Sequence, residues 1–241
     1  SASTVRSNAC FVDCFRFEAK AGQHIVAAVL AHGIDSRSQG RNTRGFTDAS
    51  IELLDEQGRV VADALDTVGL DPVIEYTAAA DGWLTARVSL VGYLGFPEAV
   101  YRLTLGEAPY PLVAFPPGGK RGETVEVELH GPNIQPGTRT KLAIPADGFP
   151  LDYASPLGTH DVRLVRGDFD EVLESEPNNE RSQATPLNLP GTVNGRFDVA
   201  GDADWYRLTL PAGQRVRLEI IAQRFLRSPV DTRLEVFQAG D

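Results

Sequence analysis

Two distant stretches of the sequence repeat one another, and this repeat constrains the fold more than any other feature. Residues 13–23 read DCFRFEAKAGQ and residues 204–214 read DWYRLTLPAGQ, so an aspartate, an arginine and an Ala-Gly-Gln turn recur at a constant offset. Both copies continue with apolar residues at alternate positions, over residues 25–31 and 216–222. Period-two alternation with turns at equal places predicts one β-module that is used twice.

Short strand patterns separated by turn signals fill residues 11–106. After an insertion the repeat resumes in this region, because residues 48–53 (DASIEL) match residues 231–236 (DTRLEV). Helical periodicity is not sustained anywhere, so the pattern predicts an all-β chain of tandem antiparallel β-sandwiches, of jelly-roll or immunoglobulin type. The strands expected here are residues 11–19, 23–32, 49–55, 59–64, 72–77, 83–91 and 100–106.

The sequence changes character after residue 107. Pro109 and Pro111 interrupt regular pairing, because proline donates no ladder hydrogen bond. A glycine-rich turn at residues 116–122 (PPGGKRG) then precedes an alternating strand at residues 124–130 (TVEVELH). This order resembles the start of immunoglobulin-like IPT/TIG domains of multidomain surface proteins. Further strands are expected at residues 113–115, 139–144 and 161–165.

The second copy contains several motifs beyond the repeat itself. It resembles bacterial pre-peptidase C-terminal (PPC) domains, which follow secreted proteases and occur in large exported proteins. Collagen-binding domains of clostridial collagenases are relatives with the same β-sandwich. The resemblance extends to the first copy from residue 13 onward. In the second copy it rests on Glu176-Pro-Asn-Asn179, Gly195-Arg-Phe197, Gly201-Asp-Ala-Asp-Trp-Tyr206, Pro211-Ala-Gly-Gln214 and Ser228-Pro-Val-Asp231.

We therefore expect three domains. A PPC-like sandwich spans residues 1–107, an immunoglobulin-like domain spans 108–172, and a second PPC-like sandwich spans 173–241 and is incomplete at its C-terminus. Strands of this last domain are expected at residues 191–197, 205–210, 216–222 and 232–237. The strands that follow Gly58 have no second copy, so a half sandwich would expose an apolar face. We expect the chain to be a fragment of a longer protein.

Acidic and amide side chains gather before and inside the second copy. Asp202 and Asp204 would lie about 6.6 Å apart on one side of an extended segment. Oxygen donors at this density, without histidine or cysteine, suit Ca²⁺. The PPC resemblance implies the same site, although Asn179 replaces an aspartate of that pattern. The alternative is a cluster of turns and caps. The candidate ligands are Glu174, Glu176, Asn178, Asn179, Asp202 and Asp204.

In the first copy of the repeat, Asp13 aligns with Asp204 and is the only acidic residue at the corresponding place, so no calcium site is expected there. Its two cysteines, Cys10 and Cys14, would lie about 13 Å apart on a continuous strand, too far for a bridge. A turn at Cys10 would still allow a local disulfide, which is the first interpretation, and two buried free thiols are the second.

Composition limits the partners. The net charge of −10 disfavours nucleic acid and anionic membranes. No apolar run is long enough to span a bilayer, and the first residues lack the pattern of a signal peptide. We expect a secreted, periplasmic or cell-surface bacterial protein whose export signal is not in this chain.

Catalysis is not expected. The four histidines (His24, His32, His130 and His160) lack a nucleophile or metal motif around them. The sequence indicates a non-catalytic structural or adhesive array that contacts other domains of the same protein or of a partner envelope protein. One alternative is a module that binds collagen-like peptide or polysaccharide. Another is an accessory region of a secreted peptidase or other hydrolase whose catalytic domain lies elsewhere.

Overall fold

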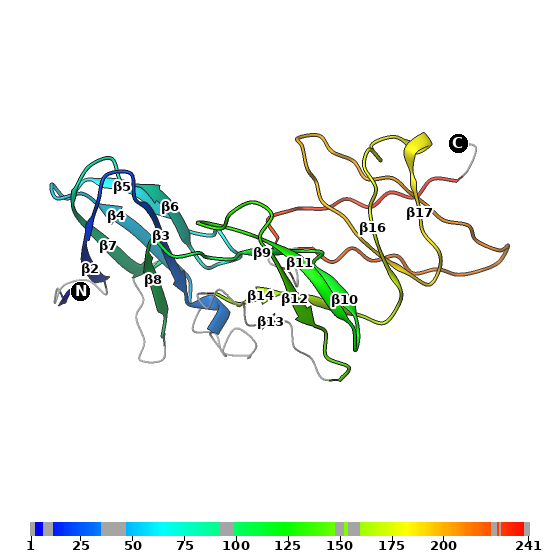
Figure 1. Ribbon diagram of the computed structural model, residues 1–241, viewed down its shortest axis with the longest axis horizontal. Helices are drawn as coiled ribbons and strands as arrows, with labels where there is room; N and C mark the ends of the chain where they lie inside the picture. Colours follow the sequence, from blue (N-terminus) through cyan, green and yellow to red (C-terminus); the bar gives the residue numbers. More distant parts are fainter. Residues whose placement is uncertain are drawn as a thin grey trace. The chain divides into compact units, whose positions relative to one another are not determined.

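A computed structural model of the protein describes residues 3–6, 12–34, 47–91, 99–147, 152–153, 160–222, 226 and 228–238 (Figure 1). Regular structure in these residues is nearly all β, which confirms the expected fold class. The helical segments with described bounds are two 3-10 turns, η1 (His32–Ile34) and η4 (Arg181–Gln183). No helix in the described part of the chain is long and apolar enough to cross a bilayer.

The chain divides into two compact units. The first holds Ser1–Tyr110 with Arg227–Pro229, and the second holds Pro111–Leu226 with Val230–Asp241. The expected boundary after residue 107 lies close to this division. The expected boundary after residue 172 falls inside the second unit, so the three-domain organisation stays a prediction.

The first unit is a sandwich of two antiparallel sheets. Their strand orders are β1-β2-β7-β4-β5 and β6-β3-β8. The seven strands expected in this region are confirmed, and β1 is an additional strand. The strands are β1 (Ser3–Arg6), β2 (Val12–Ala19), β3 (His24–Leu30), β4 (Ala49–Leu54), β5 (Val60–Ala64), β6 (Val73–Thr77), β7 (Gly82–Leu90) and β8 (Arg102–Gly106).

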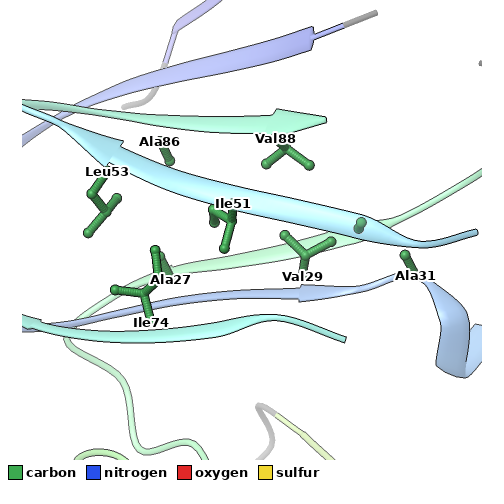
Figure 2. Close-up of a cluster of buried hydrophobic side chains, with 9 residues drawn as sticks. Ala27, Val29, Ala31, Ile51, Leu53, Ile74, Ala86 and Val88 are labelled. Carbon is green, nitrogen blue, oxygen red and sulfur yellow. The ribbon is translucent and has the colours of Figure 1, made fainter. Parts of the chain in front are cut away.

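The core of the first unit lies between these two sheets, as Figure 2 shows. It takes alternate residues from β3 and β4 because successive side chains of a strand point to opposite faces. The alternation expected over residues 25–31 and 48–53 is therefore the inner face of the sandwich. The buried residues of this core are Ala27, Val29, Ala31, Ala49, Ile51, Leu53, Ile74, Ala86 and Val88, each at most 4% exposed.

The second unit begins with a three-stranded antiparallel sheet of order β12-β11-β9. A short parallel pair, β10 with β15, lies beside it, so the run PPGGKRG holds a strand as well as a turn. Glycine permits this pairing, because a Cβ on Gly118 would lie 2.5 Å from the carbonyl oxygen of Val165. The strands are β9 (Val113–Phe115), β10 (Gly118–Lys120), β11 (Thr124–His130), β12 (Arg139–Ala143), β13 (Asp152–Tyr153), β14 (Val162–Arg163) and β15 (Val165–Gly167).

The remainder of the second unit holds only short strands. β16 (Glu171–Leu173) pairs in parallel with β18 (Thr192–Asn194), and β17 (Thr185–Pro186) pairs in parallel with β19 (Tyr206–Arg207). The strands expected at residues 191–197 and 205–210 are thus much shorter than expected. These short parallel pairs stand beside the antiparallel sheets that were expected.

The strands expected at residues 216–222 and 232–237 do not form, and that prediction is wrong. In the first unit the matching strands β3 and β4 obtain their ladder partners from β5, β6, β7 and β8. The described residues hold no strand that pairs with residues 216–222 or 232–237. An alternating pattern without a partner strand has nowhere to place its backbone hydrogen bonds.

The turn of the repeat is nevertheless built alike in both copies. Gln23 N–H donates to the carbonyl of Lys20 at 3.0 Å, and Gln214 N–H donates to the carbonyl of Pro211 at 3.1 Å. The intervening Gly22 and Gly213 have φ angles of 79° and 80°, a region that only glycine adopts readily.

Cys14 lies half-buried on β2 and is a free cysteine. Cys10 lies outside the described residues. The local disulfide given as the first interpretation is therefore absent at Cys14, which is a free thiol as in the second interpretation but is half-buried rather than buried. The physical reason is that β2 holds Cys14 in a regular ladder, opposite Val5 of β1 and Arg87 of β7.

Candidate metal centre

Two backbone hydrogen bonds position the segment that carries the acidic residues. The N–H of Glu174 donates to the carbonyl of Asn194, at the end of β18, at 3.0 Å. The N–H of Trp205, just before β19, donates to the carbonyl of Asn178 at 3.0 Å. Residues 174–178 are thereby held between β18 and β19, with their side chains beside Asp204.

Three carboxylates converge at this place. One oxygen each of Glu174, Glu176 and Asp204 lies within 4.8 Å of the others. Ligands at about 2.4 Å from a calcium ion lie at most about 5 Å apart, on opposite sides of the ion. The spacing of the three carboxylates therefore suits a single ion bound between them.

Asn178 directs its side chain into the same cluster. The residue is fully buried, with no exposed surface. One end of its amide group lies 3.3 Å from Asp204 Oδ1 and 3.2 Å from Glu176 Oε1. The NH₂ group at this end would donate two hydrogen bonds when no cation is bound. The carbonyl oxygen at this end would make a fourth ligand, since adjacent oxygens of a calcium shell lie at about this separation.

The other two candidate ligands support a loop. Asn179 Oδ1 accepts a hydrogen bond from the N–H of Ala203 at 3.0 Å. Asp202 accepts from the N–H groups of Asp198 and Ala203 at 2.8 and 3.0 Å. The segment turns at Gly201, whose φ is 86°, and Asp202 and Asp204 lie before β19 and not on a strand. The structure brings together Glu174, Glu176, Asn178 and Asp204, and it uses Asn179 and Asp202 to hold the loop.

The cluster is electrostatically strained in the absence of a cation. Burial, as the largest cause, and the negative charges of Glu174, Asp202, Glu176 and Asp198 together raise the pKa of Asp204 from 3.8 to about 7. Burial also raises the pKa of Glu174. Within the described residues, no lysine or arginine forms an ion pair with Glu174, Glu176 or Asp204. A divalent cation would supply the missing positive charge.

Tyr206 and Gly195 complete the site, and the sequence reasoning missed both roles. The Tyr206 hydroxyl donates to Glu174 Oε2 at 3.2 Å, and the N–H of Arg196 donates to Glu174 Oε1. A Cβ on Gly195 would collide with Glu174 Oε2 and would lie 2.7 Å from the Tyr206 hydroxyl. The repeat contained a signal for Tyr206, since the first copy has Phe15, without a hydroxyl, at the matching position.

The equivalent place in the first unit is built differently. Asp13, the counterpart of Asp204, accepts a hydrogen bond from the hydroxyl of Tyr101 at 2.7 Å. The hydrogen bond leaves this carboxylate with a protein partner of its own. The expectation that calcium does not bind there stays a prediction.

None of the described histidines belongs to this cluster. His24 Nδ1 is hydrogen-bonded to the hydroxyl of Thr77 at 3.0 Å, on the exposed surface of the first unit. His130 lies 3.5 Å from Glu128 on β11. Neither pair by itself makes a hydrolytic site, which requires a nucleophile, a base and a third group that orients the base. The expectation that the chain carries no catalytic site stays a prediction.

No family model, curated protein or solved structure matches this chain. The resemblance to PPC and IPT/TIG domains therefore stays a prediction that rests on the quoted motifs.

Proposed function

We propose that this chain is a non-catalytic structural part of an exported bacterial protein, in which β-sandwich modules of PPC type space or attach other domains. In this proposal a calcium ion bound by Glu174, Glu176, Asn178 and Asp204 rigidifies the start of the second PPC-like module. The observation that carries it is the fully buried Asn178 side chain, aimed into three carboxylates that have no cationic partner in the described structure.

The chemistry of the cluster favours calcium over softer metals. Its donors are carboxylate and amide oxygens only, which hard cations prefer, and zinc would favour histidine or cysteine. The cluster is also partly open to solvent, since Glu176 is exposed, so water would fill the remaining coordination positions. A site with few charged ligands and open positions suits the millimolar calcium found outside cells.

Calcium should stabilise the second unit against heat. A ligand that binds only the folded state stabilises it by about 2.7 kcal/mol at one hundred times its dissociation constant. We expect 10 mM CaCl₂ to raise the melting temperature of the full chain by several degrees relative to EDTA, and equimolar MgCl₂ to raise it less. Differential scanning calorimetry measures both shifts.

The matched variants are Asp204→Asn, which removes one ligand charge, and Asp170→Asn. Asp170 is an exposed carboxylate paired with Lys120 outside the cluster. The quantity to compare is the calcium-dependent shift, because Asp204→Asn also relieves repulsion in the metal-free chain and raises its melting temperature. The Asp204 variant should lose the shift and the Asp170 variant should keep it. An unchanged shift in Asp204→Asn would contradict the proposal and leave the cluster as a set of turns and caps.

A further inference from the structure

Arg196 lies between the candidate metal site and the three-stranded sheet of the second unit. Its backbone N–H donates to Glu174 Oε1. Its guanidinium group lies over the ring of Phe115, 4.0 Å from the ring centre. Phe115 belongs to β9, where it lies opposite Glu128 of β11. One residue therefore contacts both a candidate calcium ligand and a sheet that holds none of the candidate ligands.

The backbone around Arg196 depends on such a contact to hold its position. Asn194 ends β18 and is buried. The chain then leaves the ladder, because residues 195–198 belong to no strand. Gly195 carries no side chain, and a Cβ there would collide with Glu174 Oε2. The Arg196 side chain is therefore the first one after β18 that can attach this segment to another element.

The guanidinium group of Arg196 has a second contact, with Asp198. Arg196 Nε lies 3.8 Å from Asp198 Oδ1. The Asp198 N–H in turn donates to Asp202, in the loop that precedes Asp204. Asp198 belongs to the same segment as Arg196, so this ion pair shapes the segment without attaching it elsewhere. Of the two contacts, the one with Phe115 joins the segment to a different sheet.

Glu174 can accept the Arg196 hydrogen bond and still bind an ion. Each carboxylate oxygen has about two lone-pair sites. Oε1 therefore keeps one site after accepting from Arg196, and Oε2 keeps one after accepting from the Tyr206 hydroxyl. Two donors on one carboxylate fix its orientation, and groups that orient a metal ligand in this way strengthen metal binding. The position of the Arg196 N–H thus affects how well Glu174 is prepared for an ion.

We propose that Arg196 is a positioning residue of the calcium site, which it couples to the β12-β11-β9 sheet through the ring of Phe115. The contact with Phe115 holds the Arg196 N–H at Glu174, and this N–H orients Glu174 for the ion. The coupling is reciprocal, so a bound ion also strengthens the attachment of residues 195–198 to the sheet. Calcium then stiffens this sheet and the start of the second PPC-like module together. This inference rests on the proposed calcium site.

The test measures the calcium affinity of the full chain by isothermal titration calorimetry. Phe115→Leu keeps an apolar side chain on β9 but removes the ring face. It should weaken calcium binding about two- to fivefold, the strength of a cation–π contact at an exposed site. Phe115→Tyr keeps the ring and should bind calcium as the original chain does. The control Phe169→Leu removes an exposed ring of the same unit and should leave the affinity unchanged.

A double-mutant cycle separates this role from a general structural effect of Phe115. In an Arg196→Gln background the guanidinium group is absent, so Phe115→Leu should leave calcium affinity unchanged. Arg196→Gln also removes a positive charge near the ion, which by itself strengthens calcium binding. This electrostatic effect cancels when the effect of Phe115→Leu is compared between the two backgrounds.

Three results would overturn the inference and leave the calcium site in place. Phe115→Leu could bind calcium as tightly as the original chain, or Phe115→Tyr could bind it as weakly as Phe115→Leu. Phe115→Leu could also weaken binding by the same factor in both backgrounds. A different result, an original chain that binds no calcium, would remove the proposed site itself and this inference with it.

Discussion

Asp204 belongs to the candidate metal site and also affects the stability of the second unit. Its carboxyl group lies beside Glu176 and the buried Asn178, and it has no cationic partner in the described structure. Burial is the largest cause of its raised pKa, followed by the charge of Glu174. The same carboxylate that would bind a cation therefore destabilises the folded chain when no cation is present.

This raised pKa predicts how the metal-free chain responds to pH. Asp204 has a pKa of about 7 in the folded chain, against 3.8 for the ordinary side chain. Between these values the folded state binds more protons than the unfolded state, so the free energy of unfolding falls as pH rises from about 4 to about 7. In EDTA we expect the melting temperature of the second unit to fall over this range.

The control for this prediction is Asp204→Asn, which cannot titrate. The pH dependence between pH 4 and pH 7 should be flatter in this variant than in the original chain, as measured by thermal melting in EDTA. Saturating calcium should restore stability at pH 7 in the original chain, because the cation offsets the carboxylate charge. An equal dependence of the melting temperature on pH in the two chains would show that Asp204 does not cause the loss of stability between pH 4 and pH 7.

At the scale of elements, equal strand patterns form strands in one copy and not in the other. Residues 24–30 form β3 because β6 and β8 pair with it on both sides. Residues 216–222 alternate in the same way but join no ladder in the described structure. Alternation therefore predicts which face of a strand is apolar, whereas the strand itself requires neighbours for its backbone.

Two substitutions at equivalent positions of the repeat test whether the second copy buries its apolar side chains. Ile51→Ala should lower the free energy of unfolding by about 2–5 kcal/mol, because the side chain is fully buried in the core. Leu234→Ala, at the equivalent position, should change it by less than about 0.5 kcal/mol, because that side chain is half exposed. Chemical denaturation followed by circular dichroism measures both values. A large effect of Leu234→Ala would show that the second copy buries this face in solution.

At the scale of the whole molecule, the chain divides into two compact units that carry different features. The closed sandwich belongs to the first unit, and the acidic cluster belongs to the second. The sequence contains two tryptophans, and they are divided between the units: Trp83 lies on β7 of the first unit, and Trp205 lies next to Asp204. Each unit thus contains its own fluorescent reporter.

This division predicts that calcium acts on one unit only. In a Trp83→Phe variant, thermal unfolding monitored through Trp205 should shift to higher temperature with calcium. In a Trp205→Phe variant, unfolding monitored through Trp83 should not shift. Separate transitions are expected because two compact units need not unfold as one cooperative block. A calcium-dependent shift of equal size in both variants would show that the units unfold together.

The fold of the first unit was predictable from sequence almost strand by strand. Each of its seven expected strands combines period-two alternation with a bounding turn, and the positive φ angles of Gly22 and Gly58 confirm two of those turns. The buried Asp71 was not predictable. Its carboxylate accepts hydrogen bonds from the N–H groups of Ala31, His32 and Gly33 at 2.7–3.0 Å, and these residues lie far from it in sequence.

Residue type alone indicated that oxygen ligands gather around the EPNN run, and alternation alone indicated the inner faces of β3 and β4. Only the tertiary structure decided which oxygens converge. The turn at Gly201 directs Asp202 toward backbone N–H groups, and the hydrogen bond from the N–H of Trp205 to the carbonyl of Asn178 holds the buried Asn178 side chain beside Asp204. Only the tertiary structure also showed that residues 216–222 and 232–237 form no strand. Both outcomes depend on contacts between residues that are distant in sequence. The local pattern determines which way a side chain points, whereas the neighbouring segment determines which groups it contacts.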